Sequence, residues 1–282
     1  MITPYSNIIS VTTLEALLLD TYSGAAAAYS LRKLSATYTG SAIRVRRASD
    51  NTEQDIGFVS NELDTSALTT FCSGTDGFVE TWYDQSGNAN DATQATAADQ
   101  PQIVSSGSVI LDNGKPALEF DGTRQMETSW NLTILSESIF VVGLFRNANS
   151  AFTRMIEQTN NTTIYGGQYL PLLSGTSTNF IGYFDIERAA ISITNDIQYL
   201  FTSIQSGTNL TNYLNSTTNA SSSFNHNVNY NLLAIGGKTS VKTSPSAARL
   251  NGKIQEIIIY TSDESTNRTN IETNINNFYS IY

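Results

Sequence analysis

The stretch Trp82-Tyr83-Asp84-Gln85-Ser86-Gly87, followed closely by Asn90-Asp91-Ala92, decides the fold that this chain is expected to adopt. It places turn-forming Gly, Asn and Asp directly after a short run in which apolar and polar residues alternate. The same pattern recurs around Ile43–Ala48 and in most segments towards the C-terminus. Such alternation is typical of β-strands, and the clusters of Gly, Asn, Ser and Asp are typical of turns between antiparallel strands. The chain is therefore predicted to be mainly β.

The composition agrees with this prediction. The chain has 282 residues, of which 40% are hydrophobic, enough to bury a sizeable core in one domain. Only 14% of the residues are charged, so Asn, Thr, Ser and Gln must build the surface, and these residues suit strands and turns. The net charge of −10 argues against nucleic acid as a partner. Arg44, Arg46 and Arg47 alternate along a predicted strand and are interpreted as a solvated or carboxylate-paired face.

Three helices are expected among the strands. They cover about Thr12–Asp20, where Thr12 and Glu15 form a capping box, Ala25–Ala36, and Ser265–Tyr279. The best strand candidates are Ile43–Ala48, Phe78–Tyr83, Ala117–Phe120, Ser138–Phe145, Asn179–Asp185, Gln198–Gln205, Leu210–Leu214, Asn231–Ile235 and Lys253–Tyr260. The last strand is almost continuously apolar from Ile254 onward, which predicts an interior strand covered on both faces, with the C-terminal helix as one cover.

No internal repeat or linker divides the chain. We expect residues 1–19 to form an N-terminal arm with the start of the first helix, and residues 20–282 to form one domain with an opening segment (20–104) and a body (105–282). Cys72 is the only cysteine, so no internal disulfide is expected. No run approaches the ~20 apolar residues of a membrane span, and the N-terminus lacks the basic region of a signal peptide.

The opening segment resembles the catalytic domain of glycoside hydrolase family 54, the arabinofuranosidase B type. The residues that carry this resemblance include Phe71-Cys72-Ser73-Gly74-Thr75 and Tyr83-Asp84-Gln85-Ser86-Gly87. Lys115–Gly122 and Asn251–Tyr260 are similar to the first and closing strands of concanavalin A-like or laminin G-like jelly rolls. The resemblance implies a concanavalin A-like antiparallel β-sandwich (jelly roll) with two or three short peripheral helices.

The same resemblance implies where catalytic residues would lie. Family 54 enzymes hydrolyse arabinofuranosides with retention, using a nucleophilic carboxylate and an acid/base carboxyl about 5 Å apart. Asp185-Ile186-Glu187-Arg188-Ala189 is the nearest match to the nucleophile segment, which puts Glu187 at the nucleophile. The acid/base position corresponds to Lys238, in Gly236-Gly237-Lys238. A lysine with its ordinary pKa of about 10.4 cannot replace that carboxyl, so no catalytic residue is expected to function.

Other constellations are weaker. Two family cysteines correspond to Leu19 and Gly77, which suits a protein folded in a reducing cytoplasm. His226 is the only histidine, so a zinc site with several histidines is excluded, and no Gly-x-Ser-x-Gly motif accompanies it. No cofactor or metal is expected; Asp112-Asn113 and Asp121 are interpreted as turn residues, with a calcium loop as the alternative.

Four aromatic residues are candidates for stacking on sugar rings. They are Trp130, Tyr165, Tyr169 and Tyr183, and for each the alternative is an ordinary place in the sheet.

The leading hypothesis from the sequence is a non-catalytic virion structural protein. It would be a bacteriophage head fibre, capsid decoration or tail-associated protein, assembled in the host cytoplasm and attached through residues 1–19. Its partners would be other virion proteins, further copies of itself (a trimer is one form), and glycans on a cell surface. One alternative is a retaining arabinofuranosidase-like hydrolase in which Glu187 pairs with Asp185, Asp196 or Glu157. Another is a free carbohydrate-binding module.

Overall fold

The computed structural model describes the backbone of most of the chain. The described residues are 16–134, 136–146, 153–159, 167–173, 179–184, 187–223, 228–237 and 249–282. Within them, the side chains of 131–134, 167–173, 179–184, 187–192, 218–223 and 228–229 are not described. Most of the expected N-terminal arm and the start of the first expected helix therefore lie outside the described residues.

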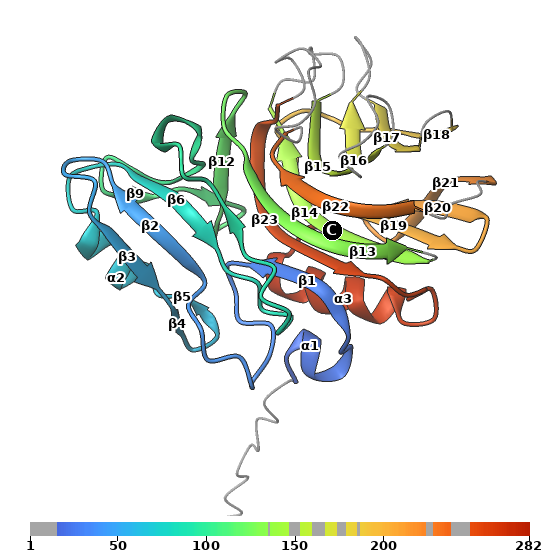
Figure 1. The fold of residues 1–282 in the computed structure, drawn as a ribbon, viewed down its shortest axis with the longest axis horizontal. Coiled ribbons are helices and arrows are strands. Elements are labelled where there is room, and N and C mark those ends of the chain that lie inside the picture. The colour runs from blue at the N-terminus through green and yellow to red at the C-terminus, as the bar shows by residue number, and fades with distance from the viewer. Residues whose placement is uncertain are drawn as a thin grey trace, which may run out of the picture.

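The molecule consists of antiparallel strands that curl into two facing layers (Figure 1). In one layer, β23 (Asn251–Tyr260) pairs on one side with β1 (Ala25–Ser30) and β12 (Leu118–Asp121). On its other side follow, in this order, β14 (Glu137–Phe145), β19 (Tyr199–Ser206), β20 (Asn209–Leu214) and β21 (Thr217–Ser223). The other layer has the order β13 (Met126–Ile134), β22 (Val228–Ile235), β15 (Thr153–Thr159), β16 (Gly167–Leu173), β17 (Asn179–Phe184) and β18 (Glu187–Ser192).

A third group of strands joins the two layers at one end, on the left of Figure 1. It contains β2 (Ile43–Arg47), β3 (Glu53–Ile56), β6 (Gly77–Trp82), β7 (Ala92–Thr93), β8 (Gln102–Ser105) and β9 (Ser108–Val109). Strand β6 pairs with β7, which reaches β13, and with β8, which reaches β12. Two small hairpins are β4–β5 (Phe58–Val59, Glu62–Leu63) and β10–β11 (Leu111–Asp112, Lys115–Pro116). The helices are α1 (Leu18–Thr21), α2 (Thr65–Phe71), a 3-10 turn (Ala97–Asp99) and α3 (Arg268–Tyr279).

Strand β23 is buried on both faces, as its apolar sequence predicts. Ile257 and Ile259 belong to the core between the two layers. Ile258 and Tyr260 point the other way and pack against Ile271 of α3 in a second apolar cluster. Full burial of one such side chain contributes about 1.5–3 kcal/mol, so the two clusters together fix β23 in the centre of the domain. The predicted mainly β sandwich with short peripheral helices is confirmed.

The predicted helix over Ala25–Ala36 is wrong. Ala25–Ser30 is strand β1, and every residue in it is buried. The alanines and leucines of this segment have helical spacing and propensity, but the space beside β23 admits only an extended chain, and such tertiary packing overrides a weak intrinsic preference. The sequence also missed α2, whose signal is the N-cap Asp64, with its carboxylate 2.9 Å from the backbone N of Ala67.

Other expectations are confirmed. Helix α3 ends at Tyr279 as predicted but begins at Arg268, three residues late. Arg44 and Arg47 are carboxylate-paired, with Asp55 and Asp50 respectively. No helix within the described ranges is long and apolar enough to cross a membrane.

A buried ion pair ties β1 to β23 and α3. Arg32 Nε lies 2.8 Å from Glu256 Oε2, and its Nη2 lies 2.9 Å from Oε1. The Ser30 hydroxyl donates to the same carboxylate at 2.7 Å, and the Tyr279 hydroxyl does so at 3.3 Å. Because the pair is bidentate and has further donors, the buried charges are well compensated.

Candidate functional site

The segment Tyr83–Asp91 follows β6 and lies along the edge of β1 that β23 leaves free. The Asp84 carboxylate accepts from the backbone N of Ala28 at 2.8 Å, and the backbone N of Gln85 donates to the carbonyl of Ala28 at 2.8 Å. Further along, the side-chain amide of Asn88 donates to the carbonyl of Ala25 at 3.0 Å. The segment therefore bonds β1 much as a neighbouring strand would.

Asp84 and Gln85 are buried, and the oxygen and nitrogen atoms of both side chains are hydrogen bonded. Besides Ala28 N, the Asp84 carboxylate accepts from Ser86 N at 2.9 Å, Ser86 Oγ at 2.7 Å and Asn90 N at 3.0 Å. The side-chain amide of Gln85 donates to the carbonyls of Ser30 and Arg32, each at 3.0 Å, and its oxygen accepts from Leu34 N at 2.8 Å. These motif residues hold the scaffold together, and neither presents a free group to a substrate.

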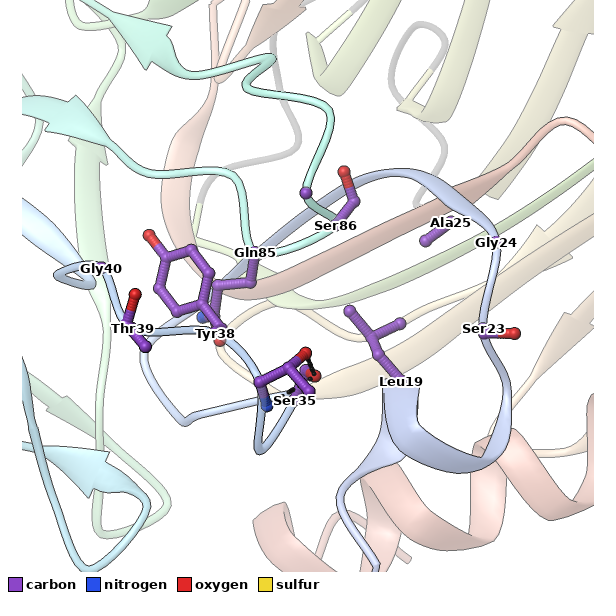
Figure 2. A pocket seen from close by; sticks show the side chains of 12 residues that line it. Leu19, Ser23, Gly24, Ala25, Ser35, Tyr38, Thr39, Gly40, Gln85 and Ser86 are labelled. Atoms are coloured by element: carbon purple, nitrogen blue, oxygen red, sulfur yellow. Dashed lines mark hydrogen bonds between the residues drawn. The ribbon is translucent and has the colours of Figure 1, made fainter.

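Two adjoining hollows open beside this segment. The first has a volume of about 350 Å³ and lies between the start of β1, the Ser35–Gly40 turn and Gln85–Gly87. Figure 2 shows Tyr38, Thr39 and Ser35 on one side of it, and Leu19 and Ser23 on the other. The second has a volume of about 490 Å³ and shares Gly24, Ala25 and Ser86 with the first. We call the two together the β1 groove.

The second hollow contains one of the aromatic residues that the sequence suggested for sugar binding. Trp130, on β13, is only 5% exposed and lines this hollow together with Asn88, Asn90 and Thr261. Within the part of the chain that the structure describes, its indole N–H has no hydrogen-bond partner. The sequence could not assemble this set, because its members are up to about 240 residues apart; the only local signal was the run of Ser, Gly and Asn after Gln85.

The first hollow contains Tyr38, whose hydroxyl donates to the carbonyl of Ser41 at 2.8 Å. Burial, with a smaller contribution from the charges of Asp91 and Asp84, raises the pKa of Tyr38 to about 12. Burial also raises the pKa of Asp91, with the charge of Asp84 adding to it. At neutral pH the phenol thus stays protonated. The groove has the chemistry of a neutral binding site and no group placed for proton transfer.

The residues expected at the hydrolytic site are described only in part. Glu187 is the first residue of β18, and its backbone pairs with Phe184 of β17. Tyr169 of β16 pairs in register with Tyr183 of β17. The side chains of Glu187, Tyr169 and Tyr183 are not described, and Tyr165, Lys238, Asp185 and His226 lie outside the described residues. The nucleophile and acid/base assignments therefore stay predictions.

Two of the alternative carboxylates do have described side chains. Glu157, on β15, is fully buried, and its Oε2 lies 2.9 Å from Nη1 of Arg154. Its backbone pairs with Tyr169, so it stands in the layer that carries β18. Asp196 is exposed on a turn.

The sequence reasoning missed a second buried glutamate near Glu157. Glu137 accepts a hydrogen bond at 2.7 Å from Gln158, which follows Glu157 on β15. The available signal was a charged residue directly before the apolar run that begins at Ser138.

The residues considered for calcium have other contacts. Asp121 accepts from Thr123 N at 2.9 Å and from the Thr123 hydroxyl at 2.7 Å, as a turn residue does. Burial raises the pKa of Asp112, and the nearby Lys253 opposes that shift. Within the part of the chain that the structure describes, no three His, Cys, Asp or Glu residues cluster as a metal site would need. Cys72 is buried, and its burial raises the pKa of the thiol.

Comparisons with known proteins identify relatives of this scaffold. The family model of the alpha-L-arabinofuranosidase B catalytic domain matches residues 20–211. A solved arabinofuranosidase in complex with arabinofuranosyl-alpha-1,2-xylobiose superposes with a TM-score of 0.68 at 17% identity, over 92% of this chain. A family 54 arabinofuranosidase soaked with a cyclic sulfate inhibitor gives 0.66 at 16% identity, also over 92% of this chain. This chain spans 64% of the length of each of these two enzymes.

A smaller relative shares part of the fold. Domain 4 of an extracellular family 43 arabinanase from Geobacillus stearothermophilus, in complex with arabinotriose, gives a TM-score of 0.51 at 12% identity, over 68% of this chain and 91% of that one. No curated protein sequence matches the chain.

These findings correct the leading hypothesis from the sequence. The expected bacteriophage virion protein (head fibre, capsid decoration or tail-associated protein) is contradicted, because the matched family is that of arabinofuranosidase B, and the two solved structures that share the fold over 92% of this chain are arabinofuranosidases. The hypothesis kept the family scaffold but took the substitution at Lys238 as sufficient to make it non-catalytic. The match covers residues 20–211 and ends before Lys238, so it shows the family and leaves the role of that position a prediction.

Proposed function

Because this chain belongs to the family of the arabinofuranosidase B catalytic domain, we propose that it is a glycoside hydrolase that releases arabinofuranosyl units with retention of configuration. The match over residues 20–211 carries the proposal. The likeness of the fold to solved arabinofuranosidases over 92% of the chain supports it.

The proposed nucleophile is Glu187. In a retaining mechanism this carboxylate attacks the anomeric carbon and forms a glycosyl-enzyme intermediate, which water then hydrolyses. The motif match puts Glu187 at this role, and Glu187 is the first residue of β18.

The residue at the acid/base position, Lys238, determines which substrates should react. A general acid contributes about 10²–10⁴-fold by protonating the leaving oxygen. An acidic phenol leaves as its anion and needs little protonation, whereas a sugar hydroxyl is a poor leaving group and must be protonated. If Lys238 replaces the acid, the enzyme should therefore cleave 4-nitrophenyl arabinofuranoside far better than an arabinosylated xylan. If Glu157, Asp185 or Asp196 supplies the proton instead, both substrates should react.

The test measures release of 4-nitrophenol from 4-nitrophenyl α-L-arabinofuranoside. We expect turnover in the unchanged protein and its loss in Glu187→Gln, because an amide cannot act as the nucleophile. Glu53→Gln is the matched control, since it makes the same change at an exposed glutamate on β3, in the third group of strands and away from β18. Azide, which attacks the intermediate without a general base, should accelerate turnover if the second carboxyl is missing. Turnover unaffected by Glu187→Gln would contradict the assignment, and sugar binding without any turnover would favour a binding module.

A further inference from the structure

We propose that the β1 groove is a second carbohydrate site, which binds a neutral oligosaccharide and takes no part in bond cleavage. The floor of the groove is the start of β1, beside α1, at the lower edge of Figure 1. Strand β18, which begins with Glu187, lies at the upper right. The two sites are therefore apart, and the groove does not depend on the proposed hydrolysis.

The charge of the lining selects a neutral ligand. All residues that line the two hollows are described, and none of them is charged. Asp84 lies just beneath, but four hydrogen bonds from the protein already use its two carboxylate oxygens. A charged ligand would lose its hydration here without gaining a counter-charge, whereas a polyol exchanges its bonds to water for bonds to amides and hydroxyls.

Trp130 points to a ligand with hydrogen-bond acceptors. The residue is only 5% exposed, and among the described residues its Nε1 has no hydrogen-bond partner. An unsatisfied buried donor costs about 1–3 kcal/mol, and such groups in native proteins usually bind water or a ligand. Trp82, the other tryptophan, also lacks an Nε1 partner, but it is fully buried beside the ring of Tyr29 and lines neither hollow. Of the two tryptophans, Trp130 is the one that lines the groove.

Further polar atoms are available along the groove. Among the described residues, nothing donates a hydrogen bond to the side-chain oxygens of Asn88 and Asn90. Both amides use their nitrogens, which donate to the backbone of β1 and, in Asn88, also to the Ser86 hydroxyl. The hydroxyls of Thr39 and Thr261 also have no recorded partner, and both residues are exposed. Acceptors and donors thus lie in the same groove, where they can replace the hydrogen bonds that sugar hydroxyls make to water.

The walls of the groove are preorganised. Gln85 and Asp84 are buried and hydrogen bonded, and Asn88 and Asn90 are held by the carbonyls of Ala25 and Ala26. A ligand therefore need not order the loop when it binds, which removes one of the main entropic penalties of association.

The experiment titrates the full chain with arabinotriose and, separately, with xylotriose, and follows tryptophan fluorescence and heat. We expect saturable binding of at least one of these neutral sugars, and no binding of tri-galacturonic acid, which has the same size but carries carboxylates. Trp130→Phe should weaken binding about tenfold, the effect of one lost hydrogen bond of ordinary strength, and should abolish the fluorescence change. The matched control is Trp82→Phe, the same substitution at the tryptophan that does not line the groove, which should leave the dissociation constant unchanged.

Three outcomes would overturn the proposal: no binding of either neutral sugar up to its solubility limit, equal affinity in Trp130→Phe, or tighter binding of the acidic trimer. Circular dichroism checks that each variant is folded, and Thr261→Val offers a milder change in the same hollow if Trp130→Phe is not. The same titration in Glu187→Gln, alone and combined with Trp130→Phe, separates this proposal from the proposed hydrolase. Groove binding should persist in the single variant and weaken in the double one, whereas sugar held at the hydrolytic site should not respond to Trp130→Phe. Hydrolysis without groove binding defeats only the second site, and binding without hydrolysis defeats only the enzyme.

Discussion

Two regions of this molecule bury polar side chains, but they differ in whether those side chains have hydrogen-bond partners. Around β1, the side-chain oxygens and nitrogens of Asp84 and Gln85 and both carboxylate oxygens of Glu256 have hydrogen-bond partners. On β19 and β20, the hydroxyl of Ser203 and both polar atoms of the Asn212 amide are buried and have no hydrogen-bond partner among the described residues. These two residues face each other in register, and both are less than 5% exposed.

The difference shows which region is built for rigidity. A fully bonded polar network fixes one geometry, because any movement leaves a buried group unsatisfied. A buried amide without a partner stabilises nothing by itself and costs free energy unless water or another molecule completes it. We therefore expect substitutions around β1 to be strongly destabilising and those at Ser203 and Asn212 to be nearly neutral.

The largest effect is expected at the buried ion pair. Arg32→Met leaves the Glu256 carboxylate buried without its counter-charge, which should lower the free energy of unfolding by about 3–5 kcal/mol. Urea unfolding followed by circular dichroism measures it. The double variant Arg32→Met with Glu256→Leu should recover most of the loss, because two apolar side chains need no compensation. A double variant no more stable than the single one would show that packing, and not charge, holds this contact.

The next effect is expected at Asp84. Asp84→Ala removes the carboxylate that accepts hydrogen bonds from the backbone N–H groups of Ala28, Ser86 and Asn90. It should lower the free energy of unfolding by about 3 kcal/mol. Asp84→Asn keeps one acceptor oxygen and should cost about half as much. If the two variants unfold at the same urea concentration, the acceptor oxygen that Asn retains adds no stability. The hydrogen bonds to Asp84 would then not explain the rigidity of the region around β1.

A small effect of either sign is expected on the other side of the comparison. Asn212→Leu replaces a buried amide that has no partner in the described structure with an apolar side chain of similar size. The free energy of unfolding should stay within ~1 kcal/mol of the unchanged protein, or rise. A loss of several kcal/mol in the same urea assay would mean that bound water or a ligand satisfies this amide, and the two regions would then be alike.

The smallest effect concerns pH. Hydrogen bonds from Arg44, and a further one from Tyr83, lower the pKa of Asp55. A lowered folded pKa contributes stability that is present above the unfolded value of about 3.9 and is lost as the pH falls through the folded value. Since the Asp55 side chain is 40% exposed, the contribution should be well under 1 kcal/mol. Asp55→Asn should therefore flatten the acid limb of stability slightly.

Asp91 should behave in the opposite sense, because burial raises its pKa. Its neutral form is the better tolerated one, so its contribution is present below the unfolded value and is lost as the pH rises through the folded value. Asp91→Asn should remove that loss. Urea midpoints measured from pH 3 to 8 test both variants, and slopes of the same sign would contradict the assignment.

Much of the fold could be predicted because local pattern and tertiary burial agree. The apolar run of β23 predicts only a buried strand, and the spacing of Ile271 and Ile275 predicts only a helix. The structure has both elements. Ala25–Ser30 is ambiguous, since its alanines favour a helix whereas the strand that it packs beside in the fold requires a strand. Local propensity cannot decide such a case, because the deciding contacts come from β23, more than 200 residues away.

The candidate sites were less predictable for the same reason. The sequence correctly indicates a turn at Asp84–Gly87, but the role of Asp84 depends on Ala28, 56 positions earlier. Trp130 was suggested from its residue type alone, and its place in a hollow with Asn88 and Thr261 follows only from the packing of three distant segments. The catalytic pair depends on side chains near Glu187 and Lys238, which the structure does not describe.

The hydrogen bonds from Tyr83–Asp91 to β1 also bear on the behaviour of the protein in crowded solution. An outer strand with unoccupied amides and carbonyls is a template on which a second molecule can add its own strand, and a chain rich in Asn and Ser with few charges has little electrostatic repulsion to prevent this. Here the chain has already filled that position with its own loop, so a second molecule finds no open row of amides and carbonyls along this edge of β1.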